Sequence, residues 1–212
     1  MTENSIPAAE FYTTIETGAM AEFRDRGSRF IAYTFPMADQ PAFKDKLAEL
    51  KKEHPKATHH CFAYRIGLTA DQWRVSDDGE PSGTAGRPIL GQIDSKQLTN
   101  IGIVVVRYFG GSLLGVPGLI AAYKSAAAMA LQVTRFVQKP ILAAYQIQFD
   151  YTQMNEVMKV IKQFDCTVLK QETNLFCMIE AGVPKNRQDE VIYKIREIRG
   201  AEISATDSQT HR

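Results

Sequence analysis

The sequence predicts an α+β protein made of two domains, residues 1–139 and residues 140–212. The chain has 212 residues, a length that suits one large or two small domains, and 44% of them are apolar, enough for a packed core. Residues 101–108 form a continuous apolar run, which is typical of a strand buried on both faces. Residues 143–205 show alternating strand and helix patterns, and the polar Gln138-Lys139-Pro140 before them is interpreted as a linker.

The N-terminal part begins with patterns for two strands and a helix. Residues 11–20 and 29–37 are predicted strands, the second rich in aromatic and β-branched side chains, and the charged stretch between them is typical of a turn. Residues 39–54 place apolar side chains at helical spacing, with Asp39 as the N-cap and Pro41 in the first turn.

A strand predicted over residues 58–66 places His59 and Cys61 on the same face. That pair could begin a zinc site, but no second pair stands at metal-ligand spacing, so we expect no metal. The three cysteines lie in apolar strand-like runs without regular spacing, which favours reduced thiols and a reducing compartment. Trp73, beside Arg74, is either a stacking platform or, more simply, a core or strand residue.

Two glycine-rich polar loops, residues 76–87 and 109–118, flank the apolar run. Glycine is costly to order, so a domain that keeps two such loops is expected to use them. In the first loop an acidic cluster precedes Ser82 and Thr84, either of which would cap a helix over residues 85–92. The loop is either a turn with a capped helix or an anion site at a helix N-terminus, and its density of polar side chains favours the anion site.

Arg107 stands near the end of the predicted central strand, where an unpaired charge would be strongly disfavoured. It is expected either to pair with Asp77, Asp78 or Glu80, or to bind a ligand anion, and both alternatives stay open. The second loop leads into an alanine-rich helix over residues 118–131, a geometry known for anion binding. It lacks the end of a P-loop motif and the full dinucleotide motif.

These patterns together predict a binding cleft formed by the two loops and the end of the strand. Its predicted binding residues are Asp77, Asp78, Glu80, Ser82, Gly83, Thr84, Arg87, Arg107, Gly110 and Gly111. No catalytic residue and no cofactor is predicted, because the sequence shows no activated nucleophile with a nearby base.

The C-terminal part carries the order strand, helix, strand, strand, helix, strand. The predicted strands cover residues 143–151, 166–173, 175–183 and 201–205, and the predicted helices residues 152–164 and 185–199. This βαββαβ order is that of the ferredoxin-like fold. Residues 207–212 are expected to fray.

The motifs DDGEPSGTAGRP and VVVRYFGGSLLG, with SRFIA and HHCFAYRIG before them, resemble the YigZ/IMPACT family over nearly the whole chain. The resemblance implies an N-terminal domain like domain 2 of ribosomal protein S5. It also implies a ferredoxin-like C-terminal domain similar to the last domain of translocating elongation factors. Eukaryotic relatives regulate translation by competing for a ribosome-associated activator of a stress kinase. They use an additional domain, so that particular role is not expected to carry over.

Composition limits the class of partner. The net charge of +1 does not predict the basic footprint of a protein held to nucleic acid by phosphate contacts alone. The apolar run is too short for a membrane span and the first residues lack a signal-peptide pattern, so we expect a cytoplasmic protein without a membrane partner.

The sequence therefore predicts a binding protein that regulates translation through RNA, the ribosome or a ribosome-associated protein. The alternative is an enzyme acting on a small phosphorylated or anionic substrate, with Arg87 and Arg107 holding the phosphate. In a third interpretation both loops are structural and Arg107 is locked to the acidic cluster. The oligomeric state is not predicted.

Overall fold

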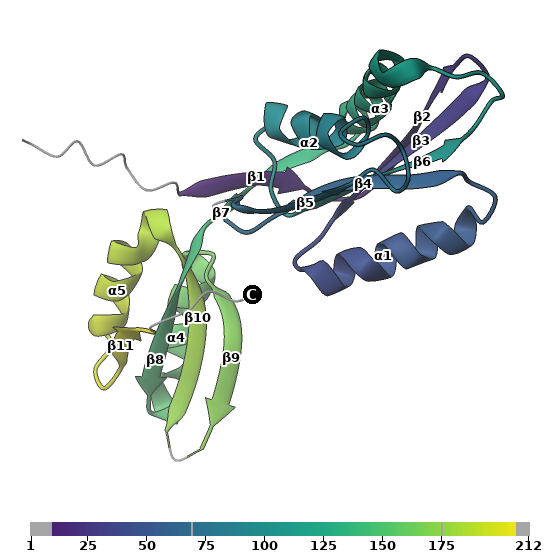
Figure 1. Cartoon of the computed structure of the whole chain (residues 1–212). Coiled ribbons are helices and arrows are strands. Elements are labelled where there is room, and N and C mark those ends of the chain that lie inside the picture. Colours follow the sequence, from purple (N-terminus) through teal and green to yellow (C-terminus); the bar gives the residue numbers. More distant parts are fainter. Residues whose placement is uncertain (1–9, 69, 175, 207–212) are drawn as a thin grey trace, which may run out of the picture. The chain divides into compact units, whose positions relative to one another are not determined.

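The computed structural model describes residues 10–68, 70–174 and 176–206 of a mixed α/β protein (Figure 1). The described residues divide into two compact units, which we treat separately. The larger unit comprises residues 12–139, and the smaller unit comprises residues 140–206 together with residues 10–11.

The larger unit is built on a five-stranded antiparallel sheet in the order β2-β3-β6-β4-β5. Its strands are β2 (Ala19–Asp25), β3 (Ser28–Pro36), β4 (His59–Ile66), β5 (Gln72–Ser76) and β6 (Ile101–Tyr108). β6 lies in the middle of the sheet and is buried from its first residue to Arg107, so the predicted central strand is confirmed.

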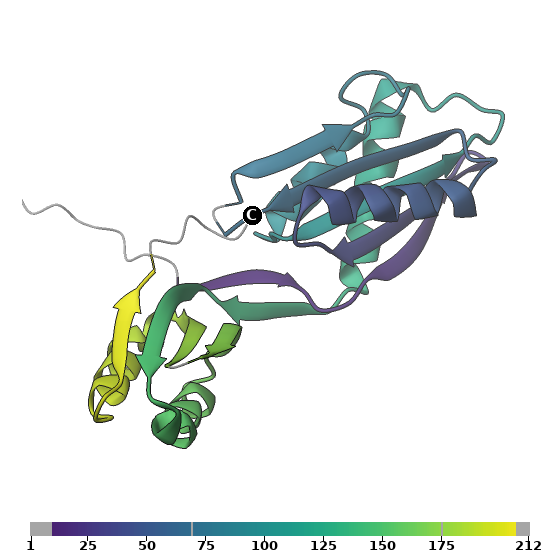
Figure 2. The same ribbon diagram turned by 90° about the horizontal axis from the view of Figure 1, so that it is seen from below.

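Helices cover both faces of this sheet (Figures 1 and 2). One face carries α2 (Gly86–Ser95) and α3 (Gly115–Gln132), and the other carries α1 (Gln40–Glu53). β4 serves both cores by simple alternation, because Cys61 packs into the cluster beneath α2 and α3, whereas Phe62 packs into the cluster beneath α1.

Two expectations for the N-terminal part are wrong. The predicted strand over residues 11–20 is in fact β1 (Phe11–Ile15) followed by the start of β2, and the charged stretch after it is mostly strand. Its turn is confined to Arg26 and Gly27, which have φ angles of 44° and 78°. The charges fit a strand because β2 is an edge strand, where Glu22 pairs with Arg24 and Arg29 outside the core.

The predicted linker at residues 138–140 is also strand. It ends β7 (Phe136–Pro140), which pairs with β1 in a two-stranded sheet. The helix predicted over residues 118–131 begins earlier, at Gly115.

The smaller unit has the predicted order of strands and helices. Its antiparallel sheet has the order β11-β8-β10-β9. The elements are β8 (Leu142–Phe149), α4 (Met154–Gln163), β9 (Thr167–Thr173), β10 (Cys177–Pro184), α5 (Gln188–Arg196) and β11 (Glu202–Ala205). Tyr151, the last residue of the first strand predicted for this unit, lies in a 3₁₀ turn and is 69% exposed. The residues expected to fray lie outside the described part.

The described cysteines are free thiols, with Cys61 and Cys177 buried. None of the described helices combines the length and the apolar character that a membrane span requires.

The start of α1 provides a test of the local analysis. The carboxylate of Asp39 accepts a hydrogen bond of 2.9 Å from the backbone N–H of Ala42, as predicted for an N-cap. Replacing Asp39 with Ala should lower the free energy of unfolding by about 1 kcal/mol, measured by urea denaturation. Asp45→Ala, in the exposed interior of the same helix, should cause no loss, because alanine favours helix there. Equal effects of the two substitutions would contradict the capping role.

Candidate functional site

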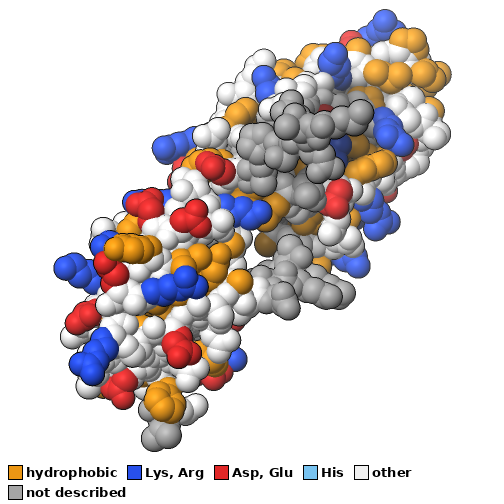
Figure 3. Space-filling view, turned by 90° about the vertical axis from the view of Figure 1, so that its left-hand side faces the viewer, with side chains coloured by type: hydrophobic (Ala, Val, Ile, Leu, Met, Phe, Trp, Pro, Cys, Tyr) orange, Lys and Arg blue, Asp and Glu red, His pale blue; other side chains and the backbone are white. Residues whose placement is uncertain are grey.

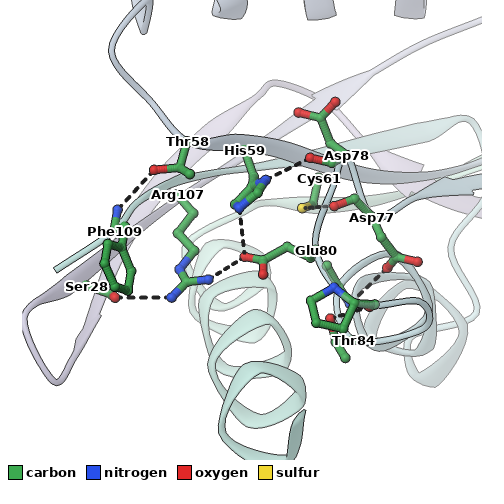
Figure 4. Close-up of polar contacts among 12 residues, drawn as sticks. Ser28, Thr58, His59, Cys61, Asp77, Asp78, Glu80, Thr84, Arg107 and Phe109 are labelled. Atoms are coloured by element: carbon green, nitrogen blue, oxygen red, sulfur yellow. Dashed lines mark hydrogen bonds and ion pairs between the residues drawn. The ribbon is translucent and has the colours of Figure 1, made fainter. Parts of the chain in front are cut away.

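The two glycine-rich loops meet around a buried ion pair at the end of β6 (Figure 4). The guanidinium of Arg107 donates to Glu80 Oε1 at 2.6 Å and to Ser28 Oγ at 3.3 Å. The side chains of Arg107 and Glu80 are only 6% and 3% exposed. Of the two alternatives for Arg107, the structure shows pairing, and only Glu80 of the acidic cluster is its partner.

Other side chains complete the surroundings of this pair. Glu80 Oε1 also accepts a hydrogen bond from the hydroxyl of Tyr123 at 2.7 Å. The guanidinium of Arg107 lies 5.3 Å from the ring centre of Phe30 and 5.7 Å from that of Phe109, which adds cation–π attraction. The two charges thus compensate each other, while the buried Nε of Arg107 has no hydrogen-bond partner among the described residues.

The nearby thiol and phenol are not poised for chemistry. Cys61 Sγ lies 3.3 Å from Tyr123 Oη and 3.0 Å from the carbonyl oxygen of Asp77. Burial is the largest cause that raises the pKa of Cys61 and of Tyr123 far above their ordinary values. Both groups therefore stay protonated at neutral pH, and the thiol is a poor nucleophile.

Asp77 caps helix α2, which corrects the expectation for Ser82 and Thr84. Its carboxylate accepts from the backbone N–H groups of Gly83, Ala85 and Gly86 at 2.8, 3.0 and 2.8 Å. Burial alone would raise the pKa of Asp77, but the three N–H donors outweigh it, and the pKa is lowered. Sequence spacing pointed to the nearest hydroxyls, whereas the cap comes from a residue nine positions before Gly86.

The hydroxyls of the first loop have other surroundings. Thr84 is buried and donates its hydroxyl to the carbonyl oxygen of Pro81 at 2.6 Å. Ser82 is exposed. Asp78 accepts from the backbone N–H of His60 at 2.6 Å, while its carbonyl accepts from His59 Nδ1 at 2.7 Å. Asp78 therefore joins the loop to β4.

The second loop contains a glycine that is required by a close backbone approach. A Cβ atom on Gly110 would stand 1.9 Å from the carbonyl carbon of Gly27 in the β2–β3 turn. The N–H of Gly110 donates to Ser28 Oγ at 3.2 Å, and that of Phe109 to Thr58 Oγ1 at 3.2 Å. Gly111 has a φ of +86°, a conformation that favours glycine.

Arg87, predicted to hold phosphate beside Arg107, has different surroundings. It is exposed at the start of α2, and its guanidinium lies 4.9 Å from the ring centre of Trp73. Trp73 is 43% exposed in β5, so the strand placement is confirmed and the core placement is wrong. Its stacking partner is Arg87 and not the adjacent Arg74.

Among the described residues, no group of three His, Cys, Asp or Glu side chains could hold a metal ion. Four apolar side chains in the second loop and at the start of α3 are exposed: Leu113 at 84% and Val116 at 51%, with Phe109 and Ile120 also exposed. We call these four residues the apolar loop patch.

The sequence did not predict the apolar loop patch. Val116 and Ile120 are four residues apart and share one side of α3, and Leu113 lies in the loop just before the helix. The same pattern in a sequence is typical of a buried face, so only the exposure in the structure distinguishes it.

Comparison with known proteins adds to this geometry. The Impact N-terminal domain family matches residues 26–131, which include all predicted binding residues. An IMPACT family member from Haemophilus influenzae is 37% identical over 165 residues, 76% of this chain and 79% of that protein. The IMPACT family member YigZ from Escherichia coli is 34% identical over 170 residues, 79% of this chain and 83% of that protein.

A solved structure has the same fold over almost the whole chain. It is described as the crystal structure of a hypothetical protein, with a TM-score of 0.78 and 29% sequence identity. The match covers 95% of this chain and all of that one.

The buried ion pair generates the first prediction for the site. Arg107→Ala leaves the buried Glu80 without its guanidinium partner, and should lower the free energy of unfolding by about 3–5 kcal/mol in urea denaturation. Arg87→Ala, which removes an exposed arginine with one stacking contact, should cost less than about 1 kcal/mol. Adding Glu80→Ala to Arg107→Ala should recover part of the loss, because no unpaired charge then remains. An Arg107→Ala variant with unchanged stability would contradict the structural importance of the pair.

The Asp77 cap predicts a pH dependence. Asp77→Asn should cost about 1–3 kcal/mol at pH 7, because the amide nitrogen faces a backbone donor where the carboxylate accepted. A lowered folded-state pKa contributes stability that is complete above the unfolded value, about 3.9, and is lost as the pH falls through the folded value. The difference between wild type and variant should therefore be constant from pH 7 to about pH 5 and shrink below about pH 4. Denaturation curves across this range test it, and a difference that does not change with pH would refute the cap.

Proposed function

The chain belongs to the IMPACT family, and we propose that it is a cytoplasmic binding protein that regulates translation by contacting a ribosome-associated protein or a protein surface of the ribosome. Eukaryotic IMPACT is a translation regulator, which supports a role of this chain in the regulation of translation. The apolar loop patch is the proposed contact surface.

One observation carries this proposal: three charged side chains that hold the loops in place are engaged inside the unit. Arg107, Glu80 and Asp77 all bond to other groups of the protein. The network fixes the loop backbone, and the side chains of the apolar loop patch are exposed. A rigid, exposed apolar surface suits a protein partner, since ordering it on binding costs little entropy.

Charge favours a protein over RNA as the partner. Lys and Arg side chains alternate with Asp and Glu side chains on the face drawn in Figure 3. In the smaller unit, the sheet carries Glu180 beside an ion pair of 2.6 Å between Lys170 and Glu172, all lining one shallow hollow. Phosphate binding needs a concentration of basic side chains, and these surfaces mix both signs.

The proposed fold relationships agree with this function. We assign the larger unit to the S5 domain 2-like fold and the smaller unit to the ferredoxin-like fold. The βαββαβ element order and the strand order β11-β8-β10-β9 support the second assignment. Both folds occur in the translation apparatus, although fold alone does not determine function.

An enzyme acting on a small phosphorylated or anionic substrate is the weaker candidate. The arginine that would hold the phosphate is already paired with Glu80, so an incoming anion would have to break a buried ion pair. Calorimetric titration with nucleotides and sugar phosphates tests this candidate directly. Binding that is lost in the Arg87→Ala variant would favour it over the binding protein.

The binding function predicts the effect of charge in the patch. The variant with Leu113→Asp and Val116→Asp should lose co-sedimentation with ribosomes by roughly tenfold or more, because a charged group in a buried apolar interface is strongly disfavoured. Both side chains are well exposed, so the melting temperature should change little. Val133→Asp, at the exposed C-terminal end of the same helix, is the matched control and should still co-sediment.

Two outcomes would refute the proposal. One is a wild-type protein that never co-sediments with ribosomes, even at low salt. The other is co-sedimentation of the double variant equal to that of the wild type.

A further inference from the structure

A hollow lies between α1 and the sheet of the larger unit, on the face opposite α2 and α3. Its volume is about 240 Å³. Gln40, Lys44 and Leu47 of α1 line one side, and side chains of β4 and β5 line the other. This size suits one substituted ring, since pockets for larger ligands measure about 300–1,000 Å³.

Three aromatic side chains form the inner wall. Phe62 and Tyr64 of β4 are parallel within 2°, and the ring of Phe43 lies 4.8 Å from the centre of each. All three are buried, so their positions are fixed by packing. A flat apolar group can therefore pack against aromatic side chains that are already in place, at a low cost in entropy.

Two positive charges stand at the rim. Arg74 on the edge strand β5 is the cross-strand partner of Tyr64, and Lys44 follows Phe43 on α1. Both are exposed, and neither forms an ion pair with a carboxylate among the described residues. Two like charges on one small hollow repel each other, and an anion at the rim would relieve that repulsion.

We propose that this hollow binds a small aromatic anion, one flat ring that carries a single carboxylate or phosphate. The ring packs against the three aromatic side chains and Leu47, and the anionic group lies between Lys44 and Arg74. This proposal does not depend on the proposed translation function, because the apolar loop patch belongs to the loop and helix α3 on the other face of the sheet.

The experiment is an NMR titration of the ¹⁵N-labelled full-length protein with phenylacetate, phenyl phosphate and AMP. Phenylacetamide, the neutral analogue of phenylacetate, is the ligand control. We expect both phenyl anions to shift amide signals of α1, β4 and β5, and to bind roughly tenfold more tightly than phenylacetamide, the contribution of two exposed charges. Whether phenylacetate, phenyl phosphate or AMP binds most tightly identifies the anionic group and the size of ring.

Variants locate the binding to the hollow. Lys44→Ala and Arg74→Ala should each weaken anion binding roughly two- to five-fold, the usual weight of an exposed charge. Leu47→Trp fills the hollow and should abolish binding of every probe. Lys46→Ala is the matched control on α1, because Lys46 pairs with Glu49 at 2.8 Å and does not line the hollow. Ribosome co-sedimentation of Leu47→Trp should be normal, so a failure of either proposal is distinguishable from a failure of the other.

Three results would overturn the inference. The first is no shift of these signals at millimolar anion. The second is equal affinity for phenylacetate and phenylacetamide, since the rim charges would then be irrelevant. The third is a peptide with an aromatic and an acidic residue that binds at least tenfold more tightly than phenylacetate, because the hollow would then dock a protein segment.

Discussion

The larger unit is organised around one buried ion pair, Arg107 with Glu80. Arg107 belongs to the central strand, where water cannot solvate it, and Glu80 comes from a loop that must fold back over the sheet to reach it. Removing a charge pair from water costs several kcal/mol per ion, and the attraction between the charges offsets this only if the geometry is good. Such a pair therefore constrains structure more than it adds net stability.

The ion pair is connected to both loops. Ser28 links Arg107 to the N–H of Gly110, and Gly110 can approach the β2–β3 turn because neither it nor Gly27 has a side chain. On the other side, Tyr123 connects Glu80 to helix α3. One ion pair thus ties a hairpin, a strand end, a loop and a helix together. Gly110, which was predicted to bind an anion, serves here for close approach to the backbone of Gly27.

The sequence pattern predicted the elements that depend on local packing. It did not predict the contacts that depend on residues far apart in the sequence. The central strand, the cap by Asp39 and the alternation of β4 follow from the pattern of apolar residues. The cap of α2 does not, because Asp77 reaches across a loop to bond the first N–H groups of the helix. β2 was interpreted as a turn because its charges obscured an edge strand, in which charged side chains protect the sheet from further pairing.

For the candidate site, the sequence could not choose between the two alternatives for Arg107. Pairing and ligand binding require the same residue types, and only the 2.6 Å contact with Glu80 distinguishes them. The sequence could not predict the apolar loop patch for a related reason, because the exposure of a side chain depends on the folded structure.

The two faces of the central sheet of the larger unit are packed differently. Beneath α2 and α3 the core is apolar, and the buried charges of Arg107 and Glu80 pair with each other there. Beneath α1 the packing is aromatic, and Gly102 in the central strand leaves room for Phe35 and Phe43, because a Cβ there would stand 2.7 Å from the ring of Phe35. The same strand therefore carries a charge that rigidifies one face and a glycine that lets large rings pack on the other.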